Sequence, residues 1–193
     1  MNTLFGIIGL IIGAISLALG VISVLGIKIP FIRRRSWRNI KRCVNALSYA
    51  IQRDGFCPDV VIGVEGGGNF VGSLLVTNWL ACLRSKEIPF FVWGRYFEGQ
   101  EPRHPIYTNN IPDDYIKGKK VLLVDGTVYT GVTMGDVKAL LEKKQPLVIK
   151  TAALFKQKGT AFEDLNFFVY EVTRRELMPW AYTQEYKDRY GRW

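Results

Sequence analysis

The sequence predicts an α/β domain, with a mostly parallel, twisted sheet flanked by helices, preceded by one transmembrane helix. Short apolar runs typical of buried strands alternate with segments of helical periodicity, which predicts right-handed crossovers between parallel strands. Glycine-rich or threonine-rich turns follow two of the apolar runs. No side chain between Met1 and Ile27 is charged, which predicts the membrane helix.

The apolar run from Leu4 to Ile27 is long enough to cross a bilayer. Its 24 residues would extend roughly 36 Å as a helix, against about 30 Å for the hydrocarbon core. A cleaved signal peptide would start with basic residues and have a shorter apolar core, and a buried core helix is rarely apolar on all faces for this length. We therefore expect a transmembrane helix over residues 1–28. A stripe of small residues on it favours a homo-oligomer, formed through this helix or the soluble domain or both: Gly6, Gly9, Gly13, Ser16, Gly20 and Ser23.

The net charge of +9 is concentrated directly after this run. Seven of the 26 basic residues and no acidic residue lie between Lys28 and Arg42, and the other 19 basic residues face 17 acidic ones. Because basic residues are retained on the cytoplasmic side, we expect a basic juxtamembrane linker over 29–42 and a domain over 36–193 that faces the cytoplasm. The basic stretch suits anionic lipid headgroups, and we do not expect nucleic acid as a partner.

The composition excludes several other classes of protein. A hydrophobic content of 48% excludes a disordered chain. The three cysteines are not patterned as a disulfide framework. His104 is the single histidine, which excludes a histidine-rich metal site.

The elements of the domain follow from periodicity and capping. Apolar residues recur at helical spacing from Trp37 to Ile51, after a possible N-cap at Ser36, and Asp54–Gly55 ends this helix. The stretch 97–117 is polar, contains prolines and has no periodicity. The other expected elements, in order, are strand 60–62, helix 70–83, strand 90–93, strand 121–124, helix 134–143, strand 147–155 and strand 167–172.

The first unusual turn is Gly63–Asn69, between a strand and a helix. Ligands of such sheets bind beyond the carboxyl ends of the strands. The successive glycines Gly66, Gly67 and Gly68 would let backbone N–H groups approach an anion. The turn lacks the Lys and Ser/Thr of an ATP-binding P-loop. A tight turn that merely needs positive φ is the alternative.

The second unusual turn runs from Val124 to Thr133. Asp125 is expected to end a buried strand, and Thr130, Gly131 and Thr133 offer hydroxyl and backbone N–H groups at a helix start. This pattern suits a phosphate monoester, with Asp125 available for sugar hydroxyls or a hydrated cation. Alternatively, Asp125 only caps the turn.

Val121 to Thr133 resembles the ribose-phosphate signature of type I phosphoribosyltransferases. Four other segments follow in that family's order. Asp59–Gly72 resembles its pyrophosphate loop, and Arg95–Tyr96 stands where its mobile catalytic loop begins. Leu154–Lys156 resembles the strand whose lysine contacts a purine. Val172–Trp180 resembles the small C-terminal hood of xanthine-guanine and related purine members.

The resemblance implies transfer of ribose 5-phosphate from phosphoribosyl pyrophosphate to a nitrogenous base, with release of pyrophosphate and with Mg²⁺ as cofactor. The partners would be phosphoribosyl pyrophosphate, a base or nucleotide, and the membrane. Arg95 to Lys117 would close as a lid. The implied catalytic residues are Asp125, Arg95 and Tyr96, and Asp125 would also hold the metal. The implied binding residues are Asp125, Thr127, Tyr129, Thr130, Gly131, Val132 and Thr133 for ribose and phosphate, Glu65, Gly66, Gly67 and Gly68 for pyrophosphate, and Lys156, Glu176 and Leu177 for the base.

Three departures from the family pattern leave a second hypothesis open. Gly126 replaces the second acidic residue of the signature, Glu65–Gly66 replaces a hydroxyl and a basic residue, and Ala181 replaces a carboxylate. The alternative is a catalytically impaired sensor or effector that binds a ribose-phosphate or nucleotide ligand and acts at the membrane.

Overall fold

The computed structural model describes residues 33–79, 87–98, 104–108, 111–173 and 176–182. Within these ranges no helix is both long and apolar enough to cross a bilayer. The transmembrane segment expected over 1–28 lies outside them.

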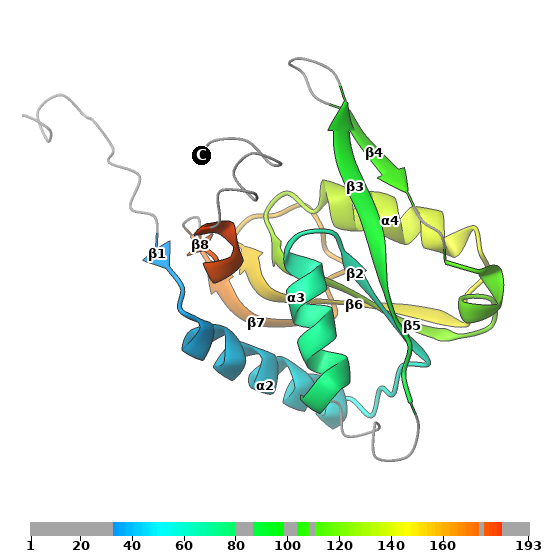
Figure 1. Cartoon of the computed structure of the whole chain (residues 1–193), viewed down its shortest axis with the longest axis horizontal. Helices are drawn as coiled ribbons and strands as arrows, with labels where there is room; N and C mark the ends of the chain where they lie inside the picture. Colours follow the sequence, from blue (N-terminus) through cyan, green and yellow to red (C-terminus); the bar gives the residue numbers. More distant parts are fainter. Residues whose placement is uncertain (1–32, 80–86, 99–103, 109–110, 174–175, 183–193) are drawn as a thin grey trace, which may run out of the picture. The chain divides into compact units, whose positions relative to one another are not determined.

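A six-stranded sheet forms the centre of the domain, with the strand order β4-β3-β2-β5-β6-β7 (Figure 1). Five strands are parallel, and β4 pairs with β3 in the antiparallel direction. The expected mostly parallel α/β sheet is therefore confirmed. The strands are β2 (Val60–Val64), β3 (Phe90–Glu98), β4 (His104–Thr108), β5 (Lys120–Val128), β6 (Val148–Gln157) and β7 (Phe167–Val172).

Helices cover both faces of this sheet. On one face lie α2 (Trp37–Arg53) and α3 (Gly67–Leu74), which continues as a π-helical segment over Leu75–Trp79, and on the other face lies α4 (Val132–Glu142). The Ser36 hydroxyl accepts a hydrogen bond from the Asn39 N–H at 3.3 Å, which confirms the N-cap of α2.

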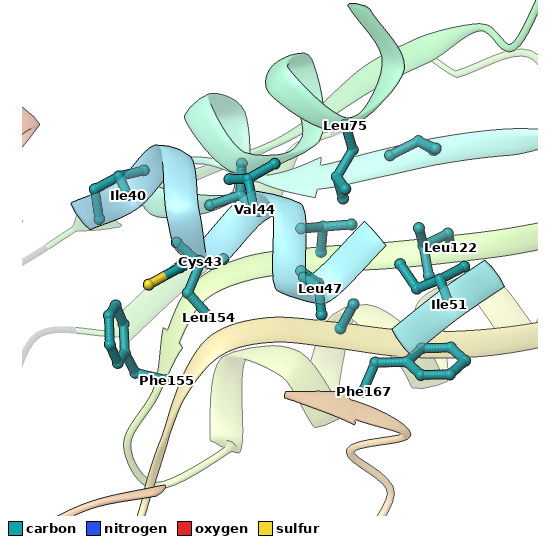
Figure 2. Close-up of a cluster of buried hydrophobic side chains, with 14 of the residues drawn as sticks. Ile40, Cys43, Val44, Leu47, Ile51, Leu75, Leu122, Leu154, Phe155 and Phe167 are labelled. Atoms are coloured by element: carbon teal, nitrogen blue, oxygen red, sulfur yellow. The ribbon is translucent and has the colours of Figure 1, made fainter. Parts of the chain in front are cut away.

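The buried side of α2 packs directly on the sheet, as Figure 2 shows. Its apolar side chains have no exposed surface and meet strand residues such as Leu122 and Leu154: Ile40, Val44, Leu47 and Ile51. Trp37 begins the same periodic series but is 52% exposed. Its ring lies at the edge of the helix, against Phe70 and Trp180.

The stretch 97–117 contains regular structure, contrary to expectation. β3 and β4 form an antiparallel ladder that pairs Arg95 with Tyr107, and a 3₁₀ turn follows over Asp113–Tyr115. Ile111 and Ile116 are buried in the core beneath α4. The sequence pattern did not predict β4, because this edge strand has only five residues and contains a proline, which an edge strand tolerates.

Several boundaries differ from the expectation by a few residues, and two of these differences bear on the expected site. α3 begins at Gly67 rather than at residue 70, and β5 continues to Val128, so that Asp125 lies within the strand and not at its end. Both differences arise where glycines bring α3 and β5 into close contact.

A small second sheet joins the start of the described chain to its end. β1 (Arg33–Arg34) pairs in parallel with β8 (Glu176–Leu177), and a 3₁₀ turn over Pro179–Tyr182 follows. The basic stretch expected as a linker over 29–42 therefore contributes residues 33–34 to β1 and residues 37–42 to α2.

Candidate functional site

The turn Tyr129–Thr133, called here the threonine turn, connects β5 to α4 at the carboxyl edge of the sheet. Gly131 is the N-cap of α4, and no side-chain hydrogen bond caps this helix start. The hydroxyl of exposed Thr130 makes only a long contact of 3.4 Å with the Val132 N–H. Because the first N–H groups of a helix have no intrahelical acceptor and lie at the positive end of its dipole, this turn is suited to bind an anion.

Position 131 requires glycine for two reasons, its backbone conformation and the lack of space for a side chain. Its φ is +83°, a left-handed value that side chains disfavour. A Cβ at this position would also overlap the Phe162 side chain. The turn can therefore keep its shape only with glycine at this position.

Asp125 lies in β5, four residues before the threonine turn. Its Oδ1 accepts a hydrogen bond from the Gly126 N–H at 2.6 Å, and it lies 3.1 Å from the position that a Gly67 Cβ would occupy. The carboxylate is therefore held beside the first turn of α3. Among the described residues no three His, Cys, Asp or Glu side chains come together as a metal site.

The turn Gly63–Gly68, called here the glycine turn, lies on the neighbouring βα unit. Gly66 has φ +101° and is the N-cap of α3, which also has no side-chain cap. A Cβ on Gly67 would lie 2.8 Å from the Gly126 Cα, and one on Gly68 would overlap the carbonyl oxygen of Val124. Gly67 and Gly68 thus allow the backbone of α3 to pack on β5, whether or not a ligand binds to their N–H groups.

Gly126 occupies a confined position at the same contact. A Cβ there would lie 3.0 Å from the Gly67 Cα and 3.1 Å from Cζ2 of Trp180. Trp180 in turn stacks on Phe70 of α3, with ring centroids 4.9 Å apart. A side chain at position 126 would therefore require Gly67 or Trp180 to move slightly.

Tyr129 connects the threonine turn to the small sheet. Its hydroxyl accepts a hydrogen bond from the Glu176 N–H at 3.2 Å and lies 3.4 Å from the Glu176 carbonyl oxygen. The Glu176 carboxylate accepts a hydrogen bond from Arg35 Nε at 2.5 Å, and the two side chains are only 4% and 10% exposed. The Leu177 carbonyl oxygen accepts a hydrogen bond from the Arg35 backbone N–H. Two of the three expected base contacts, Glu176 and Leu177, therefore have protein partners.

The guanidinium of Arg35 lies 4.8 Å from the centre of the Phe155 ring. Cys43 is buried near the same ion pair. Burial raises the pKa of the Cys43 thiol, a change that Arg35 opposes and Glu176 reinforces. The thiol remains protonated at neutral pH, so Cys43 is not suited to act as a nucleophile.

The remaining expected site residues are placed as follows. Lys156 is near the carboxyl end of β6, opposite Val128, with its Nζ 5.3 Å from the Phe168 ring centre. Thr127 is in β5, opposite Phe155. Arg95 and Tyr96 are in β3, within the β3–β4 hairpin.

The structure therefore brings Asp125 next to the glycine turn and Tyr129 next to Glu176. Because β2 and β5 are adjacent parallel strands, the two turns that follow them lie at the same edge of the sheet.

Sequence reasoning missed two residues of this region. Arg35 lies in a run of basic residues, and nothing in that run distinguishes it as the partner of Glu176. Asn69 lies in the first turn of α3, and its Oδ1 is buried without a hydrogen-bond partner among the described residues. Its position directly after three glycines was the only available signal.

Comparison with known proteins agrees with this architecture. The model of the family described as "Phosphoribosyl transferase domain" matches residues 35–187. The hypoxanthine-guanine phosphoribosyltransferase of Aquifex aeolicus is 31% identical over 145 residues, which cover 72% of this chain and 79% of that protein. The bifunctional protein PyrR of Listeria welshimeri is 30% identical over 125 residues, which cover 60% of this chain and 68% of that protein.

Solved structures give the same result. A purine phosphoribosyltransferase from Pyrococcus horikoshii superposes with a TM-score of 0.64 and 26% identity, over 77% of this chain and 92% of that chain. A hypothetical protein from Neisseria gonorrhoeae with bound ppGpp also has a TM-score of 0.64, over 83% of this chain and 95% of that chain, and at 22% identity it supports the fold alone. Since the family model covers most of the chain, including both turns, the chain belongs to the phosphoribosyltransferase domain family.

Proposed function

We propose that this protein is a membrane-anchored phosphoribosyltransferase whose domain faces the cytoplasm. It transfers ribose 5-phosphate from phosphoribosyl pyrophosphate to a nitrogenous base and releases pyrophosphate. The single observation that carries this proposal is the start of α4, where a left-handed glycine replaces a side-chain cap and two threonines flank the helix N–H groups. In contrast, α2 has a conventional serine cap.

Each binding role follows from position. The threonine turn binds the 5-phosphate through the N–H groups at the start of α4 and the hydroxyls of Thr130 and Thr133. Asp125 binds ribose hydroxyls from the adjacent strand. The start of α3, at Gly66 to Gly68, binds pyrophosphate, and buried Asn69 Oδ1 marks a polar position beside it. Glu65 adds a negative charge that would weaken this binding.

The β3–β4 hairpin carries Arg95 and Tyr96 and would close over the reacting centre. The base would contact Lys156 and the region of Glu176 and Leu177. The relatives named for hypoxanthine and guanine favour a purine acceptor. Positioning and exclusion of water would supply much of the acceleration in such a reaction.

Mg²⁺ fits the site as an ion held mainly by the substrate. This ion usually binds proteins through one or two carboxylates and keeps its other ligands from phosphates and water. Asp125 supplies one carboxylate beside the glycine turn, and Gly126 supplies none at the next position. When bound, the ion would neutralise charge on the departing pyrophosphate.

The test is release of labelled pyrophosphate from phosphoribosyl pyrophosphate, with a panel of purine and pyrimidine bases. We expect turnover with at least one base, and loss of turnover in Asp125→Asn. No turnover with any base by a protein with native circular dichroism would contradict the proposed enzyme.

A second function is favoured by the environment of Gly126 and Glu176. The domain would bind a ribose-phosphate or nucleotide ligand without turnover and act as a sensor or effector at the membrane. Gly126 carries no second carboxylate, a Cβ there would lie 3.0 Å from the Gly67 Cα, and the Glu176 carboxylate is held in a buried ion pair with Arg35. Calorimetric binding without turnover, with a ligand-dependent change of oligomeric state, would support this function. The absence of both would exclude it.

The membrane anchor rests on the apolar run Leu4–Ile27 and the basic residues that follow it. We expect the full chain to stay in the membrane fraction during alkaline carbonate extraction. Release into the soluble fraction would contradict the anchor. If its small residues mediate association, Gly9→Leu with Gly13→Leu should reduce oligomer formation, whereas Leu4→Ile should not.

A further inference from the structure

We propose that the exposed face of α2 is a docking surface for an anionic lipid bilayer, so that the domain lies against the membrane on this helix. The inference rests on the proposed membrane anchor and adds an orientation of the domain. The α2 surface, as we define it, consists of the exposed side chains Trp37, Arg38, Lys41, Arg42, Asn45, Tyr49 and Arg53.

The charge of this surface is of one sign. α2 carries four basic residues and no acidic residue in 17 positions, and all four basic residues belong to the α2 surface. At 3.6 residues per turn, Arg38, Arg42, Asn45 and Tyr49 lie along one side of the helix. Basic residues next to a membrane segment are attracted to the negative potential of the cytoplasmic leaflet.

The opposite side of α2 packs against the sheet and is therefore not available to bind a partner. Ile40, Val44 and Leu47 have no exposed surface and pack against the sheet (Figure 2). The helix is therefore fixed to the domain, and its basic side is presented as a rigid strip rather than as a flexible tail.

Two aromatic side chains support a lipid surface over another acidic partner. Trp37 is 52% exposed at the start of the helix, and Tyr49 is 66% exposed near its end. Tryptophan and tyrosine are enriched at the headgroup level of membranes, because one part of each ring system is apolar and another part forms hydrogen bonds.

The chain length before β1 sets how far the domain can move from the bilayer. Six peptide steps separate Ile27, the last residue of the apolar run, from Arg33, the first residue of β1. Fully extended, they reach at most roughly 22 Å. The start of α2 follows within four further residues, so an anchored chain keeps this helix near the headgroups.

The experiment compares two tyrosines on opposite faces of the sheet. Full-length protein in nanodiscs carries a fluorophore attached through Tyr49→Cys or, as the control, through Tyr115→Cys, with Cys57 and Cys82 replaced by serine. Tyr115 is 44% exposed and adjoins Ile116, which is in the core beneath α4. The discs contain phosphatidylcholine alone or with phosphatidylserine, and a headgroup nitroxide quenches nearby fluorescence.

We expect phosphatidylserine to increase quenching of the Tyr49→Cys label roughly twofold or more and to leave the Tyr115→Cys label unchanged. Removing three charges by Arg38→Gln, Arg42→Gln and Arg53→Gln should shift the docking equilibrium roughly 100-fold toward the free domain. The matched variant Lys117→Gln, Lys119→Gln and Lys143→Gln, also at exposed positions, should not shift it.

Other outcomes would overturn the inference in distinguishable ways. Equal quenching of both labels in discs of either composition would exclude docking through α2 and leave the anchor intact. A Tyr49→Cys signal that depends on protein concentration and not on phosphatidylserine would assign the surface to a second copy. A chain that does not enter discs of either composition would exclude both the anchor and the docking, whereas pyrophosphate release tests the enzyme separately.

Discussion

The glycine turn before α3 and the threonine turn before α4 belong to adjacent βα units, and each has a positive-φ glycine as N-cap, but Gly67 and Gly68 have a task that no glycine of the threonine turn shares. Gly67 and Gly68 allow two backbones to touch, since a Cβ on either would overlap β5. Gly131 adopts a left-handed conformation and leaves the start of α4 without a side-chain cap. The comparison indicates that changes in the glycine turn should act mainly on stability, whereas changes of the threonine hydroxyls should act mainly on ligand binding.

The largest effect is expected from Gly68→Ala. The new Cβ would overlap the Val124 carbonyl oxygen and lie 3.0 Å from the Gly63 carbonyl carbon, and backbone atoms cannot move aside as a flexible side chain can. We expect a loss of about 3 kcal/mol or more in the free energy of unfolding, measured by urea denaturation. Gly118→Ala is the control for a glycine in open space, because Gly118 has positive φ, unlike Gly68, but nothing within 4 Å of its Cβ position. Its cost should be only about 1 kcal/mol, and equal losses would show that packing at Gly68 is unimportant.

Asp125→Asn should change activity rather than stability. The amide oxygen can still accept the hydrogen bond from the Gly126 N–H, whereas the negative charge is lost. We expect turnover to fall roughly 100- to 1000-fold, with an unchanged midpoint of urea denaturation. Asp114→Asn, at an exposed carboxylate of the 3₁₀ turn, should leave both quantities unchanged. Wild-type turnover in Asp125→Asn would remove this residue from the site.

Gly126→Asp tests the point where the two turns meet. From the sequence alone, an acid at this position restores the family pattern and should raise activity. The structure leads to the opposite expectation, because the new side chain must displace Gly67 or Trp180. We expect a loss of about 1–3 kcal/mol in stability and no gain in turnover. Increased turnover at unchanged stability would show that the site can accommodate the second carboxylate.

Tyr129→Phe should have the smallest effect. It removes the hydroxyl that joins the threonine turn to the Glu176 backbone. We expect a loss of about 1 kcal/mol in the free energy of unfolding, accompanied by weaker ligand binding. Tyr49→Phe, at a residue that is 66% exposed, is the matched control. If the two variants are equally stable, the Tyr129 hydroxyl does not support the turn.

The order of strands and helices was predictable because it is encoded in local periodicity. β7 begins and ends at the expected residues, and α2 begins directly after the expected cap at Ser36. The β3–β4 hairpin was not predictable, since its edge strand is short and is stabilised by pairing with a neighbour rather than by its own pattern.

Long-range contacts limited the prediction of the site. The location of Asp125 and the threonine turn followed from residue types at a strand-to-helix junction. The Arg35–Glu176 pair joins residues 141 positions apart, and no spacing rule connects them. Similarly, the sequence shows that residues 67 and 126 are glycines but does not show that they face one another.

The most direct test of the threonine turn is calorimetric titration with ribose 5-phosphate and with ribose. Wild-type protein should bind ribose 5-phosphate and show no measurable binding of ribose. Thr130→Val with Thr133→Val should weaken ribose 5-phosphate binding roughly 10- to 100-fold, since each change removes a hydroxyl donor to a charged group. Thr77→Val, which alters a threonine bonded within its own helix, should bind like wild type. Wild-type affinity in the double variant, or equal binding of ribose and ribose 5-phosphate, would contradict a phosphate site at this turn.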